Sequence, residues 1–109
     1  MPEAPVAPLV DLDRRRIELA LRHRARYRYV RPRVEREGDG WRVVSPCCSR
    51  NVDAPGGEIE IALLRYDASQ WHLYAWDRQR PGWVEAESSE RIHELLDEIC
   101  LDPKRIFWP

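Results

Sequence analysis

The alternation of hydrophobic and polar positions is clearest between residues 58 and 87. Apolar and polar residues alternate there with a period of two, which is typical of strands, and turn-forming residues interrupt the pattern at 67–70 and 78–82. Strict alternation would give the first of these strands two faces, one with Ile59, Ile61 and Leu63 and the other with Glu58, Glu60, Ala62, Leu64 and Tyr66. We predict three consecutive antiparallel strands in this region.

The segments before and after these strands in the sequence have apolar residues at helical spacing. It predicts an amphipathic helix over residues 11–27 and a second one after residue 89, which ends at Asp102 and Pro103. The expected core positions of the two helices are Ile17, Ala20, Leu21 and Ala25, and Ile92, Leu95, Leu96 and Ile99.

A hairpin is predicted between the first helix and the three strands. Residues 29–37 indicate a strand, in which Pro32 favours an edge position, and a turn at 38–40 leads into a strand at 41–45. The fold class is therefore α+β: one domain at 11–109, with a five-stranded, mostly antiparallel meander and both helices on one face. Residues 1–10, rich in proline, are expected to form a flexible leader.

Composition places the chain among globular proteins. Charged residues make up 34% and hydrophobic residues 43%, and no apolar run is long enough to span a membrane. Three cysteines, two of them adjacent, do not suit a disulfide framework, so we expect a cytoplasmic protein. We expect no metal and no cofactor.

Charge is unevenly distributed along the chain. Residues 1–36 carry ten arginines against five acids, whereas residues 37–109 carry eight basic residues against fourteen acids. This asymmetry indicates either a polyanionic partner or an electrostatic match between segments. In the second case Glu90, Glu94, Asp97 and Glu98 of the second helix would pair with the arginine-rich helix; otherwise they form a solvated face.

A surface rich in aromatic residues and arginine is the first candidate site. Its arginines would be Arg24, Arg26, Arg28, Arg31 and Arg33, and its rings would come from Tyr29, Trp41, His72, Tyr74, Trp76 and Trp83. Such a sheet face suits a protein partner or a homodimer. Alternatively, it would bind single-stranded nucleic acid, with bases stacked on the rings and phosphates held by guanidinium groups. A core role for the rings is the structural alternative.

The irregular loop at residues 46–57 holds the remaining candidates. Cys47 and Cys48 would serve a thiol-dependent enzyme or a redox sensor if a nearby arginine lowered a thiol pKa, although one buried and one exposed cysteine explain the pair equally simply. Arg50, Asn51 and Asp53 would form a small-ligand or anion pocket, or else close Asx turns. Cys100 is expected to be a core thiol.

Several motifs resemble a small bacterial family known as domain of unknown function 3024. They are RYD at 65–67, LYAWDR at 73–78, Trp83, and the ending that contains Asp102, Pro103, Ile106, Phe107 and Trp108. Ser45 to Gly57 depart from that family's pattern. The resemblance implies no activity, cofactor or catalytic residue. We expect a non-enzymatic bacterial binding or adaptor module.

Overall fold

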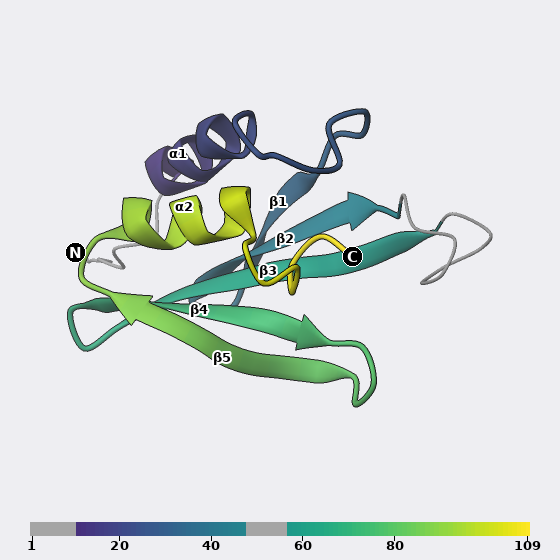
Figure 1. Ribbon diagram of the computed structural model, residues 1–109. Coiled ribbons are helices and arrows are strands. Elements are labelled where there is room, and N and C mark those ends of the chain that lie inside the picture. The colour runs from purple at the N-terminus through teal and green to yellow at the C-terminus, as the bar shows by residue number, and fades with distance from the viewer. Residues whose placement is uncertain (1–10, 48–56) are drawn as a thin grey trace.

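The chain folds into a five-stranded sheet covered on one face by two helices. The computed structural model describes residues 11–47 and 57–109. The order of elements is α1 (Asp11–Leu21), β1 (Arg33–Glu37), β2 (Gly40–Pro46), β3 (Glu58–Asp67), β4 (Gln70–Asp77), β5 (Gly82–Ser89) and α2 (Ile92–Leu101). The strands follow one another across the sheet, and all neighbours are antiparallel. Figure 1 shows α1 and α2 side by side over one face, so the predicted α+β meander is confirmed.

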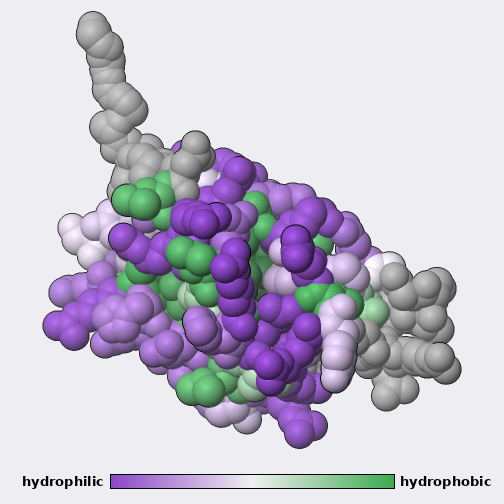
Figure 2. All heavy atoms as spheres, turned by 90° about the horizontal axis from the view of Figure 1, so that it is seen from above, coloured by the Kyte–Doolittle hydropathy of each residue, from purple (hydrophilic) through white to green (hydrophobic). Residues whose placement is uncertain are grey.

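The core lies between the helices and the sheet. The predicted stripe of α2 is fully buried, and Ile17 and Leu21 of α1 join it. Trp41, Leu64 and Leu73 contribute the sheet side. Viewed from the helix side, the surface is largely hydrophilic with separate apolar spots (Figure 2). No helix in the described parts of the chain is long and apolar enough to cross a membrane.

A bulge in β3 corrects the predicted faces of that strand. Val43 pairs with Ala62, but its neighbour Val44 pairs with Glu60, so Ile61 is an extra residue. The bulge turns Ile59 and Ile61 toward the same core as Ala62 and Leu64. The two faces predicted from strict alternation are therefore wrong for the first half of β3.

The first helix ends at Leu21 and not near residue 27. The amide groups of residues 22 to 24 bond three residues back, and the Ala25 N–H donates to the Cys100 carbonyl at 2.9 Å. Tyr27 then adopts a left-handed backbone with φ of 61°. Tertiary contacts thus replace the last predicted turns of the helix, and Ala25 is exposed.

Asp102 organises the segment that follows α2. It adopts φ of 43° at the helix end, and its N–H donates to the Glu98 carbonyl at 2.9 Å. Its buried carboxylate accepts the backbone N–H groups of Ile106 and Trp108 at 2.8 Å and that of Phe107 at 3.2 Å. The turn directs two buried aromatic rings into the core.

Candidate anion-binding site

Residues 22–32, the arginine loop, connect α1 to β1 and are held by one guanidinium group. Arg24 donates to the Leu21 carbonyl at 2.8 Å, to the Tyr27 carbonyl at 3.1 and 2.7 Å, and to the Val30 carbonyl. Its guanidinium carbon also lies 5.6 Å from the ring centroid of Trp108. Arg24 therefore gives the loop its shape, and its donors are directed into the protein.

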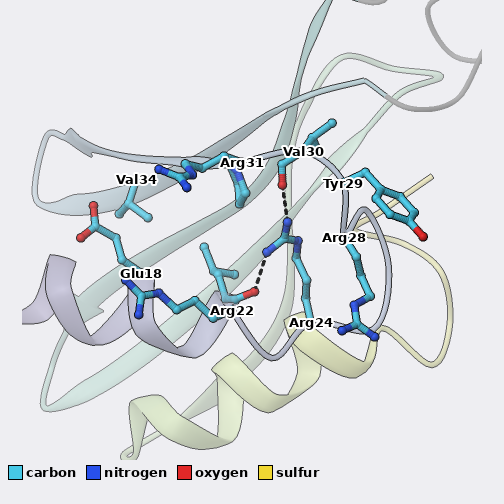
Figure 3. A pocket seen from close by; sticks show the side chains of 10 residues that line it. Glu18, Arg22, Arg24, Arg28, Tyr29, Val30, Arg31 and Val34 are labelled. Atoms are coloured by element: carbon cyan, nitrogen blue, oxygen red, sulfur yellow. Dashed lines mark hydrogen bonds between the residues drawn. The ribbon is translucent and has the colours of Figure 1, made fainter.

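A cavity of about 680 Å³ lies between α1, the arginine loop and the start of β1. Figure 3 shows Arg22 and Arg31 on opposite sides of it, near Glu18, with Arg24 bonded to the backbone between them. Arg22, Arg28 and Arg31 are exposed, and their guanidinium groups form no ion pair or hydrogen bond with the described residues. Tyr29 is fully exposed. The site thus offers three solvated guanidinium groups and one accessible ring.

The acids of α2 do not neutralise these arginines. Among the residues described, the acids of this helix have one ion pair, between Glu94 and Arg91 at 4.0 Å, although the two helices lie side by side (Figure 1). A backbone hydrogen bond from Ala25 to Cys100 instead joins the arginine loop to α2. The prediction that an acidic helix pairs with an arginine-rich helix is therefore wrong, because no ion pair joins the two among the described residues.

The face of the sheet opposite the helices, the open face, carries the other aromatic candidates. Tyr74, Trp76 and Trp83 are half-buried, and the last two rings lie edge to face at 5.1 Å. His72 contacts Glu85 through Nδ1 at 2.8 Å. The rings that remain on the sheet surface therefore come from β4 and β5.

Ion pairs cross the open face on the β1–β3 side. Arg42 binds Glu60 with two donors at 2.6 and 2.7 Å, and also Glu35 at 3.1 Å. Arg33 pairs with Glu58 and Glu35, and its hydrogen bond lowers the pKa of Glu58 below the ordinary value. Because these arginines are already paired, this half of the face offers no ready phosphate site.

The structure does not bring the predicted arginines and rings onto one face. Trp41 lies in the core beneath the helices, with the guanidinium carbons of Arg14 and Arg36 at 5.3 and 5.4 Å from its ring centroid, so its placement on a surface was wrong. Arg28 and Arg31 lie in the arginine loop on the helix side, and Arg26 in the same loop is half-buried. The candidate set is thus divided between two surfaces.

The thiol candidates are only partly described. Cys47 is half-buried, and its N–H donates to the Gly57 carbonyl at 2.7 Å. Cys48, Arg50, Asn51 and Asp53 lie outside the described residues. Cys100 is buried as expected, and burial raises the pKa of its thiol. Within 11–47 and 57–109, no cluster of three metal-ligating side chains is present.

Two contributors were missed in the sequence. Arg22 falls inside the helix predicted over residues 11–27, and only the helix end at Leu21 places it beside the cavity. Arg78, which lines a second cavity, was noticed only as part of a family motif. The spacing of the arginines along the sequence does not indicate that Arg22 or Arg78 lines a cavity.

Comparison with known proteins identifies a family but no activity. No curated protein and no solved structure is significantly similar to the chain. The model of a family described as Domain of unknown function (DUF3024) matches residues 2–109, which is essentially the whole chain. The resemblance carried by the tryptophan-rich strands and the Asp102–Trp108 ending is thereby confirmed, and the chain belongs to the DUF3024 family.

Proposed function

We propose that this protein is a non-enzymatic binding module that holds single-stranded nucleic acid at the arginine loop. The observation that carries the proposal is the group of Arg22, Arg28 and Arg31, exposed and without ion pairs among the described residues, around a cavity beside a fully exposed Tyr29. Guanidinium groups bind phosphate, and a free aromatic ring stacks with an unpaired base. A duplex keeps its bases stacked, which favours a single strand as the ligand.

The test is fluorescence anisotropy of labelled oligo(dT) and oligo(U) at several salt concentrations. Three phosphate contacts predict a slope of about −2 for the logarithm of affinity against that of salt. Arg28→Gln should reduce this slope by about 0.7. Arg80→Gln is the matched control, since Arg80 is exposed in the turn between β4 and β5.

Tyr29→Ala separates stacking from charge. It should weaken binding by about 5- to 150-fold, which corresponds to the ~1–3 kcal/mol of one stacked base, and leave the salt slope unchanged. Because the side chain is fully exposed, the substitution should not alter folding. Oligonucleotides that cause no anisotropy change at low salt, or bind the Arg28 variant as tightly as the original protein, would refute the proposal.

Self-association through the open face is a second candidate function. It is favoured by the half-exposed Trp76 and Trp83 rings on a face that neither helix covers (Figure 1). Sedimentation velocity over a range of concentrations should then show a dimer that Trp83→Ser converts to a monomer. A protein that sediments as a monomer throughout removes this candidate.

A further inference from the structure

A second cavity lies where β3 and β4 separate. Their pairing ends at Ala62 and Ala75, although β3 continues to Glu58 and β4 to Asp77 (Figure 1). A cavity of about 390 Å³ adjoins this gap, and its volume is within the range of small-molecule sites. Six of its lining residues matter here: Arg42, Val44, Glu58, Glu60, Trp76 and Arg78.

One guanidinium group that lines the cavity has no carboxylate partner among residues 11–47 and 57–109. Glu60 is held by Arg42 and Glu58 by Arg33. Among the residues that the structure describes, Arg78 bonds only to carbonyl groups, through Nη2 to that of Glu60 at 2.9 Å and more weakly to two others. Within the part of the chain that the structure describes, its buried Nε has no hydrogen-bond partner.

Burial of the Arg78 guanidinium group, which has no carboxylate partner among the described residues, costs free energy in the protein without a ligand. Removal from water lowers the pKa of Arg78 below its ordinary value, which means that nearby groups do not fully compensate its charge. A bound carboxylate would restore that compensation with short, charge-assisted hydrogen bonds. A doubly charged phosphate would instead bring a second negative charge close to Glu58 and Glu60.

The other walls of the cavity are apolar. Val44 is buried, and the half-buried ring of Trp76 is supported edge to face by Trp83. A flat ring fits such a wall, because aromatic groups pack by offset stacking or edge-to-face contact. The lining thus combines one anion-binding group with a surface for a planar apolar group.

We propose that this cavity binds a small aromatic carboxylic acid, with the carboxylate on the Arg78 guanidinium group and the ring against Trp76 and Val44. The cavity is built from sheet residues and is distinct from the arginine loop. This inference is therefore independent of nucleic-acid binding.

The test is a titration of the ¹⁵N-labelled full chain with benzoate, benzamide and phenyl phosphate, followed by NMR. Benzoate should shift the signals of the Trp76 indole N–H and the Arg78 Nε–H. Benzamide lacks the charge and should bind at least about tenfold more weakly, and phenyl phosphate should bind no more tightly than benzoate.

Arg78→Gln should abolish the preference for benzoate over benzamide, and Arg80→Gln in the same turn should retain it. If Arg78→Gln does not fold, the comparison of benzoate with benzamide on the unaltered protein decides. Equal affinities, tighter binding of phenyl phosphate, shifts confined to the arginine loop, or no shift at millimolar benzoate would each overturn the proposal.

Discussion

Replacing Asp102 by asparagine tests the role of its buried carboxylate. Asparagine has the same shape and tolerates the left-handed backbone that Asp102 adopts at φ of 43°, so the substitution changes hydrogen bonding without adding backbone strain. One acceptor oxygen becomes an NH₂ donor. With the remaining oxygen facing Ile106, that donor faces the N–H of Trp108, which now lies 2.8 Å from a carboxylate oxygen.

The expected loss is about 2–4 kcal/mol in the free energy of unfolding. A buried N–H left unsatisfied costs about 1–3 kcal/mol, and the remaining bonds lose their charge assistance. A change of about 3 kcal/mol should lower Tm by more than about 10 °C in a domain of this size. Since Trp108 lies in the core, its fluorescence also reports local loosening of the turn.

Urea denaturation followed by tryptophan fluorescence and circular dichroism measures the effect. Asp97→Asn is the matched control, because Asp97 is exposed on α2, and it should change stability by no more than about 0.5 kcal/mol. An Asp102→Asn protein as stable as this control would show that the carboxylate does not hold the turn.

Three further predictions concern the sheet and the buried thiol. Gly40→Ala should destabilise the protein in urea denaturation, because an added Cβ would lie 2.4 Å from a backbone oxygen of β3. Gly82→Ala should be tolerated in the same urea denaturation, because its Cβ would lie 3.6 Å from the nearest atom outside the adjoining residues. Arg33→Gln should raise the NMR-measured pKa of Glu58; in the original protein the lowered pKa means that the ion pair stabilises the fold at neutral pH and is lost as pH falls through that pKa. Cys100 should resist alkylation at neutral pH until the protein is denatured, as peptide mapping by mass spectrometry would show, because burial raises its pKa.

The sequence predicted those elements whose pattern depends on local spacing. The stripe of α2, the Gly38 turn and the alternation in β4 all survive in the structure. The bulge at Ile61 could not be predicted, because its position depends on how two strands pair and not on either strand alone. The end of α1 is similarly set by Cys100, far away in the sequence.

For the candidate sites, the sequence predicted which residue types would take part but not which of them would share a surface. Arginine-rich and aromatic segments were identified, but their division between two surfaces follows from the strand register and from the position of α1. Trp41 illustrates the limit, since the same residue on the other face of β2 would be a surface ring. The sequence likewise could not predict that the Asp102 carboxylate accepts the backbone N–H of Trp108, because this bond depends on the path of the chain after α2.

The contact between the two helices has a consequence for the order of folding. Every strand pairs with its neighbour in sequence, so the hairpins close short segments of chain. Docking of α1 instead joins residues 80 positions apart, as in the contact from the Cys100 thiol to the Ala20 carbonyl at 3.2 Å. Long-range closure of this kind carries a larger entropy cost and is expected after the local hairpins have formed. Weakening the contact between α1 and α2 should therefore accelerate unfolding and leave the rate of refolding nearly unchanged.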